Sequence, residues 1–115
     1  NIYTYIDNMI NDYDKLLSYI NKFHNEKVII LGYYNILGKD NDLFSYANLK
    51  LKQLCQKYNF IYIDNSKILD NNPLYIDNQS SFIPNIEGTK KISQIIIEKI
   101  INSWYNIFRN FITMT

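Results

Sequence analysis

The sequence predicts an α/β fold in which helices cover both faces of a parallel sheet. Helix-like and strand-like segments alternate along the chain in the order α-β-α-β-α. Residues 28–31 form a continuous apolar run without alternation, which is typical of a strand buried on both faces of a parallel sheet. The 115 residues, 47% hydrophobic and 20% charged, fit a single domain or part of one over residues 1–115.

Residues 3–24 are predicted to form the first helix. Its apolar residues recur at spacings of three and four and make one stripe: Ile6, Met9, Ile10, Tyr13, Leu16, Leu17, Ile20 and Phe23. The helix is expected to end near His24 and Asn25, because Asn tolerates the left-handed conformation of a helix C-cap.

Residues 27–33 are predicted to form the first strand, and residues 34–41 a loop with turn residues Gly38 and Asp40. Asp42 is the expected N-cap of a helix over 43–58. The stripe of that helix consists of Phe44, Ala47, Leu51, Leu54, Cys55 and Tyr58. A second strand follows at 60–63 and stops at Asp64. A helical crossover of this length usually joins parallel neighbours.

Residues 66–83 are the least regular region, with a turn at 71–73, a polar loop at 77–81 and a helical turn around 67–69. Asn85 is a good N-cap for the last helix, and Glu87 in its first turn complements the helix dipole. This helix is predicted from residue 86 to about 102, and as far as 111 if the apolar stripe continues. The stripe consists of Ile92, Ile95, Ile96, Ile100, Trp104, Ile107, Phe108 and Phe111.

Two strands alone make a marginal sheet with bare edges, so we expect more sheet to exist. An unseen N-terminal part, a partner chain or a second copy would supply it. Residues 104–114 are expected to pack against that missing sheet or a partner rather than on a membrane. The chain begins Asn1-Ile2-Tyr3 without an initiator Met, so we expect a processed protein, a fragment or one piece of a longer chain.

Composition argues against several functional classes. A net charge of +1 gives no basic field for nucleic acid, and no apolar run approaches the length of a membrane span. One His, one Cys and three Gly supply neither a metal cluster nor a phosphate loop, so we expect no metal and no cofactor. The single cysteine, Cys55, is expected to be a buried helix residue. It is compatible with the cytoplasm, but the compartment stays open.

Three segments resemble parts of the SGNH (GDSL-type) esterases and lipases. Because their order and spacing also match, the resemblance extends over nearly the whole chain. Residues 28–35 resemble the family strand that ends in a Gly-x-Tyr-Asn-type segment, and residues 60–64 the strand before the catalytic loop. Pro84-Asn85-x-x-Gly88 resembles the family's closing block, Asp-x-x-His-Pro-Asn-x-x-Gly. The resemblance implies a three-layer α/β/α domain with a mostly parallel sheet, of the SGNH-hydrolase or flavodoxin-like kind, of which this chain would be the C-terminal α-β-α-β-α part.

The residues that carry the family's chemistry are replaced. Ile83 stands at the position of the catalytic His and Ser80 at that of the Asp. The family's Gly-Asp-Ser nucleophile block and its oxyanion-hole Gly and Asn would lie upstream of the first helix. Asp77 is not at the spacing that would restore the Asp of the family's Ser-His-Asp triad. Asp64 is expected to form a turn, and His24 is expected to be a residue at a helix end. The resemblance therefore implies no catalytic residue in this chain.

What remains of the family pattern is a scaffold and a set of pocket candidates. Pro84, Asn85 and Gly88 are the motif scaffold. The candidates for lining a pocket are Gly32, Tyr34 and Asn35. If Ile83 replaces the catalytic His, it should pack against apolar neighbours near the carboxyl end of the sheet.

Three hypotheses of function follow. The preferred one is a catalytically degenerate SGNH-like domain that serves as a structural or binding module. In the second, the parent is an active SGNH esterase or acyl hydrolase whose Ser nucleophile lies in a missing N-terminal part. In the third, the chain is a subunit of a larger assembly. Enzyme activity is therefore left open, and the sequence favours its absence.

Overall fold

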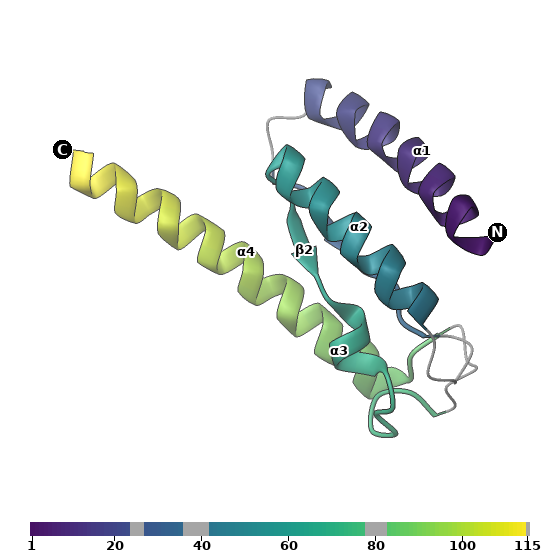
Figure 1. Cartoon of the computed structure of the whole chain (residues 1–115). Coiled ribbons are helices and arrows are strands. Elements are labelled where there is room, and N and C mark those ends of the chain that lie inside the picture. Colours follow the sequence, from purple (N-terminus) through teal and green to yellow (C-terminus); the bar gives the residue numbers. More distant parts are fainter. Residues whose placement is uncertain (24–26, 36–41, 78–82, 115) are drawn as a thin grey trace.

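Helices dominate this protein, and one small parallel sheet lies between them (Figure 1). The structure, a computed structural model, describes residues 1–23, 27–35, 42–77 and 83–114. The elements in order are α1 (Ile2–Phe23), β1 (Ile29–Leu31), α2 (Asp42–Tyr58), β2 (Ile61–Ile63), α3 (Asn65–Leu69) and α4 (Ile86–Met114).

Helices α1 and α2 run side by side and share the hydrophobic core with one face of the sheet (Figure 1). The predicted stripes explain this packing. Ile10 and Leu17 of α1 are buried against Leu51 and Leu54 of α2. The partly buried residues around them are Ile6, Tyr13, Ile20, Ile30, Tyr33, Tyr58, Phe60 and Tyr62. Leu16 and Phe23, which we placed in the α1 stripe, are instead exposed, because α2 covers only part of that stripe.

The strands β1 and β2 pair in parallel, as the crossover through α2 predicts. Their register places Ile29 opposite Ile61 and Leu31 opposite Ile63. The expectation that β1 is buried on both faces is wrong. Ile29 and Ile30 are half-buried, and the side chain of Leu31 is 42% exposed.

The prediction of a three-layer α/β/α fold is also wrong for the described residues. Helices hold 73% of them and strands only 6%, in a sheet of two strands. The apolar runs at 27–33 and 60–63 pair along three residues each. Three stacked layers need a sheet broad enough to be covered on both faces, and two strands of this length do not supply one.

The helix α4 is longer than predicted and continues to Met114 (Figure 1). It passes the sheet on the side away from α1, and its C-terminal part projects from the rest of the molecule. Ile92, Ile95 and Ile96 are half-buried, whereas every described side chain beyond Ile96 except that of Ser103 is exposed. The periodic apolar pattern therefore predicted the helix correctly, although no described element covers its end.

Candidate functional site

The block of residues 84–88 fastens the start of α4 to the preceding loop. Asn85 accepts the backbone N–H of Gly88 through Oδ1 at 2.9 Å, which confirms it as the N-cap. Its Nδ2 group donates to the Leu74 carbonyl and to Asp77 Oδ1, both at 3.0 Å. Its own backbone N–H donates to the Tyr75 carbonyl at 2.9 Å. One side chain thus caps the helix and holds the loop at 74–77 against it.

Gly88 is required by this junction because the loop backbone passes very close to it. A Cβ atom at position 88 would lie 2.2 Å from the Tyr75 carbonyl oxygen and 2.9 Å from the Pro84 Cβ. Pro84, Asn85 and Gly88 therefore act together as a structural motif. Their spacing is explained by the geometry of this junction without any catalytic role.

The position that corresponds to the family histidine lies on the surface. Ile83 is 73% exposed, so the expectation that it packs against apolar neighbours is wrong. The residue directly precedes the junction at the start of α4. This exposure weakens the alignment of Ile83 with a catalytic residue. Ser80 and His24 lie outside the described residues.

The carboxyl end of β1 brings together the residues that we considered as pocket candidates. The Gly32 N–H donates to the Ile63 carbonyl at 2.8 Å, and the Asn35 N–H donates to Asp70 Oδ1 at 2.8 Å. Burial raises the pKa of Tyr34, and it also raises the pKa of Asp70 despite the opposing hydrogen bond from Asn35. These residues hold the chain after β1 against α3, which is a structural task.

A small polar hollow of about 210 Å³ lies beside this end of the sheet. Its lining residues are Ser45, Asn48, Leu49, Lys52, Tyr62, Asp64 and Ser66. Asn48 is fully engaged, since Oδ1 accepts from the Tyr33 N–H at 2.7 Å and Nδ2 donates to the Tyr33 carbonyl at 2.8 Å. The hydroxyl of Tyr62 is buried and has no hydrogen-bond partner among the described residues. Burial first, and the nearby Asp64 and Cys55 second, raise the pKa of Tyr62 to about 12.

Asp64, for which we expected a turn-forming role, is the N-cap of α3. Its side chain accepts the backbone N–H groups of Ser66 at 3.1 Å and Lys67 at 3.3 Å, and so caps α3. The Ser66 hydroxyl also donates to Asp64 Oδ1, at 2.5 Å. A serine held by a carboxylate alone lacks the base that would activate it. The described residues include no histidine, because His24 is the only one in the chain.

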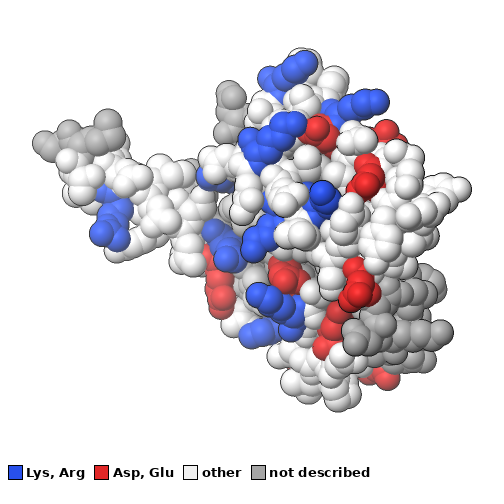
Figure 2. Space-filling view, viewed as in Figure 1, with Lys and Arg blue, Asp and Glu red and all other residues white. Residues whose placement is uncertain are grey.

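Three lysines surround the outer edge of β2. A hollow of about 490 Å³ between α2, α3 and α4 is lined by Lys52, Lys67 and Lys99 together with residues of β2 such as Tyr62 and Ile63. Figure 2 shows Lys and Arg side chains gathered on this face, between α4 and α2. The sequence alone gave no sign of this grouping, because the three lysines come from three different helices.

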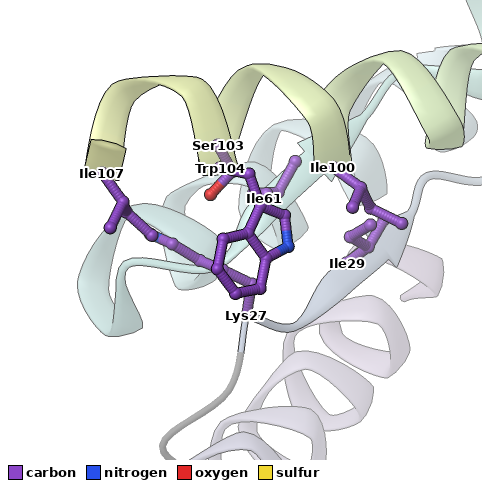
Figure 3. Close-up of a pocket in the computed structure, with 7 residues that line it drawn as sticks. All are labelled: Lys27, Ile29, Ile61, Ile100, Ser103, Trp104 and Ile107. Carbon is purple, nitrogen blue, oxygen red and sulfur yellow. The ribbon is translucent and has the colours of Figure 1, made fainter. Parts of the chain in front are cut away.

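An apolar groove of about 460 Å³ separates the start of the sheet from α4 (Figure 3). Ile29 and Ile61 form its floor, and its other lining residues are Lys27, Ile100, Ser103, Trp104 and Ile107. In Figure 3 the Trp104 ring extends from α4 toward Lys27 at the start of β1. Trp104 is 69% exposed, so the groove is open to solvent.

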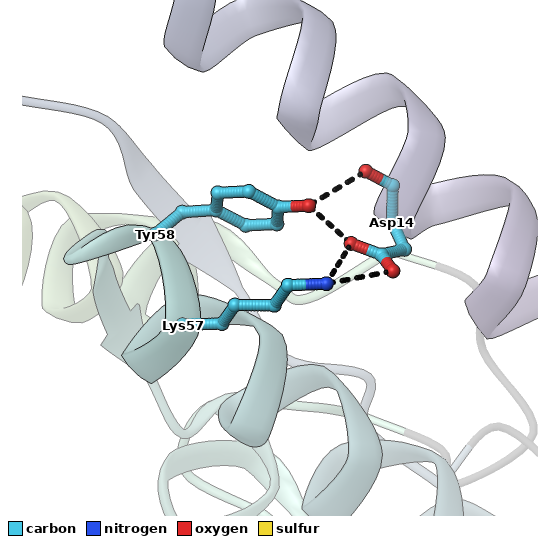
Figure 4. A network of polar contacts seen from close by, with 3 residues as sticks. All are labelled: Asp14, Lys57 and Tyr58. Atoms are coloured by element: carbon cyan, nitrogen blue, oxygen red, sulfur yellow. Dashed lines mark hydrogen bonds and ion pairs between the residues drawn. The ribbon is translucent and has the colours of Figure 1, made fainter.

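The sequence did not predict a polar cluster that joins α1 to the end of α2 (Figure 4). Lys57 Nζ lies 3.0 Å from Asp14 Oδ2, and the Tyr58 hydroxyl donates to Asp14 Oδ1. The hydrogen bonds from Tyr58 and then from Lys57 hold the pKa of Asp14 below its usual value. The pairing was hidden in the sequence because 43 residues separate Asp14 from Lys57.

Two further findings concern metal ions and membranes. In the described ranges, no group of three or more His, Cys, Asp or Glu side chains could hold a metal ion. Cys55 is 1% exposed on α2, as predicted, and burial raises the pKa of its thiol. Among the helices that the structure describes, including the 29-residue α4, none is long and apolar enough to cross a membrane.

Comparisons with known proteins give no assignment: no family model, no curated protein and no solved structure matches this chain.

Proposed function

We propose that this chain is a non-catalytic structural or binding module and a degenerate relative of the SGNH esterases. Its function is to bind another polypeptide. The observation that carries the proposal is the apolar surface on the projecting part of α4. We call it the outer α4 surface. It consists of Ile97, Ile100, Ile101, Trp104, Tyr105, Ile107, Phe108, Phe111 and Ile112, each between 41% and 69% exposed.

The size of the outer α4 surface favours contact with a partner. An aromatic side chain has roughly 150–250 Å² of surface. Trp104, Tyr105, Phe108 and Phe111 are each about two-thirds exposed, so together they contribute about 500 Å² before the five isoleucines are added. The largest apolar patch on an ordinary monomer covers about 300–600 Å². Arg109 is the only charged residue after Lys99 in α4, and the projecting part of the helix is mostly white in Figure 2. An exposed apolar surface of this size is typical of a site that contacts another molecule.

The SGNH relationship is supported by the intact junction of Pro84, Asn85 and Gly88. The degenerate character rests on the sequence resemblance alone, in which Ile83 and Ser80 stand at the positions of the catalytic His and Asp. An active esterase would need a base within about 2.6–3.2 Å of a serine hydroxyl. No described serine has a histidine neighbour, and the Ser66 hydroxyl donates to the Asp64 carboxylate that caps α3.

Association through the outer α4 surface can be tested with the whole chain. The molar mass in solution should exceed 13.8 kDa or the protein should bind an apolar fluorescent dye strongly. Trp104→Glu should lower both signals, because a carboxylate in the centre of the surface must be desolvated on association. Leu49→Glu is the matched control, since Leu49 is also exposed but lies on α2. A monomer with no dye binding, or equal effects of both variants, contradicts the binding role.

The lack of hydrolase activity has its own test. The purified protein should gain no mass on treatment with a fluorophosphonate serine probe. Labelling that a single Ser→Ala substitution abolishes would establish a nucleophilic serine and contradict the non-catalytic proposal. Labelling that survives every such substitution would reflect non-specific reaction and leaves the proposal standing.

A further inference from the structure

The strand β1 has one edge paired with β2, and its other edge has no neighbouring strand among the described residues. The Gly32 N–H donates to β2 at Ile63, and the Val28 carbonyl accepts the Ile61 N–H at 2.9 Å. Alternate residues of a strand in a parallel pair bond to the same neighbour, so Ile29 and Leu31 direct their backbone groups away from β2. No hydrogen bond from elsewhere in the described ranges reaches these outward groups.

The two edges of the sheet differ in chemistry. Lys52, Lys67 and Lys99 surround the outer edge of β2. Charged side chains, lysine above all, are a common means of keeping further strands from an edge. The edge of β1 carries instead the exposed leucine Leu31 and borders the apolar groove under Trp104. Only the β1 edge therefore has a surface suited to a further strand.

The groove beside β1 can receive the side chains of such a strand. Ile29 and Ile61 form its floor at the start of the sheet, and Ile100, Trp104 and Ile107 of α4 form its wall (Figure 3). Side chains of a strand alternate between its two faces, so every second residue of a neighbour of β1 would point to the α4 side. Lys27, at the mouth of the groove, has no ion-pair partner in the described part of the chain and would favour an acidic residue there.

We propose that the open edge of β1 binds an extended segment of a partner polypeptide as a parallel strand, with apolar residues in the groove under Trp104 and an acidic residue near Lys27. A parallel orientation would continue the pairing that β1 already makes with β2. The inference rests on the proposed binding function and specifies one of its contacts. The strand buries the exposed side chain of Leu31 and pairs its outward N–H and carbonyl.

The probe is a synthetic peptide, acetyl-Glu-Val-Thr-Val-Thr-Val-amide, added in excess to the whole chain. Its matched control has the same sequence with N-methyl groups on alternate peptide bonds, which blocks pairing and keeps the side chains. The unmodified peptide should slow amide hydrogen exchange at Leu31 at least tenfold. It should also shift the fluorescence of Trp104, the only tryptophan in the chain, to shorter wavelength. The N-methylated peptide should do neither.

Substitutions at the edge give a second measurement. Leu31→Lys places a cation on the exposed edge and should abolish the protection by the peptide, while Leu49→Lys on α2 should leave it unchanged. The circular dichroism spectrum of each variant shows whether it has folded. If Leu31→Lys does not fold, Lys27→Glu replaces it, because the reversed charge should weaken peptide binding several-fold without altering the sheet.

Three results would overturn the inference. The Leu31 amide could already exchange slowly in the dilute monomer, which would mean that the chain covers its own edge. Equal binding of the N-methylated peptide would mean that the groove binds apolar groups without strand pairing. Protection that rises with protein concentration alone would assign the edge to a second copy. The two proposals can also be told apart. If Trp104→Glu changes the association state while the Leu31 amide shows no slowed hydrogen exchange with any peptide, the binding function is supported and the strand contact is wrong.

Discussion

The Tyr62 hydroxyl lies directly against the backbone of Gly32, so that a Cβ atom at position 32 would be 2.3 Å from the hydroxyl oxygen and 2.8 Å from the ring carbon that bears it. Tyr62 belongs to β2 and Gly32 ends β1. The absence of a side chain at Gly32 therefore lets a large ring cross the end of the sheet. Gly32, which we considered as a pocket candidate, therefore has a packing role in the fold.

Gly32→Ala should destabilise the protein, because the added methyl group forces the Tyr62 ring out of its place. Overpacking of this kind costs about 1–3 kcal/mol in the free energy of unfolding. Urea denaturation followed by circular dichroism measures it. In a Tyr62→Ala background the clash with the ring no longer exists and only the closer-than-usual contact with Asn48 Oδ1, at 3.1 Å, remains, so the same substitution should then cost clearly less. An equal cost in both backgrounds would show that the ring is not the obstacle.

Tyr62→Phe should leave stability unchanged or raise it by about 1 kcal/mol at neutral pH. The hydroxyl is buried without a partner in the described residues, and an unmade hydrogen bond costs free energy. A loss of more than about 1 kcal/mol would instead show that the hydroxyl is hydrogen-bonded in solution. Thermal unfolding at pH 7 distinguishes these results.

The same residue predicts a decline of stability in alkali. Burial raises the pKa of Tyr62 from 10 to about 12, so the folded protein holds the phenolic proton more tightly than the unfolded chain. The associated stability is complete below pH 10 and is lost as the pH rises toward 12. Tyr62→Phe should therefore reduce the slope of unfolding free energy against pH in this interval. An unchanged slope would mean that the hydroxyl ionises freely in the folded state.

The sequence was sufficient to place the helices, because their apolar stripes and caps are local signals. Asn85 and the periodic residues of α4 predicted the start of a helix, although the helix continues beyond the predicted end to Met114. Local signals in the sequence could not predict the width of the sheet. Residues 28–31 read as a strand buried on both faces, but burial depends on which elements are present to cover it. Leu31 is exposed because no described element lies over it.

The candidate site shows the same division. The capping role of Asn85 could be predicted from its place before an apolar helix. The environment of Ile83 could not, since the resemblance aligned its position with a buried histidine and the junction at 84–88 turns it outward. Asp14 and Lys57 are far apart in the sequence and meet only because α1 and α2 pack together. Long-range pairs of this kind require the fold.

Asn85→Ala should destabilise the start of α4 and release the loop at 74–77. Loss of the N-cap contact with Gly88 costs about 1 kcal/mol, and the lost donors to Leu74 and Asp77 bring the total to about 2 kcal/mol. Asn85→Ser keeps a capping oxygen and should cost about half as much. Chemical denaturation measures both costs, and equal costs would mean that the capping contact with Gly88 contributes nothing.

Asp14→Asn should weaken the attachment of α1 to α2, with a pH dependence set by the lowered pKa of Asp14. Hydrogen bonds from Tyr58 and Lys57 favour the carboxylate, so the folded protein binds this proton less tightly than the unfolded chain does. The resulting stability is complete above the ordinary aspartate pKa and is lost as the pH falls through the lowered value. The wild type should thus lose its advantage over the variant in acid. Because Asp14 and Lys57 face solvent, salt at about 1 M should also reduce the greater stability of the wild type. The control is Asp12→Asn, at an exposed position of the same helix, whose effect on stability should not depend on pH or on salt in this way. Thermal unfolding at a series of pH values measures the difference in stability between the wild type and Asp14→Asn. A difference that is constant from pH 2 to pH 7 would contradict a charged contact between the two helices.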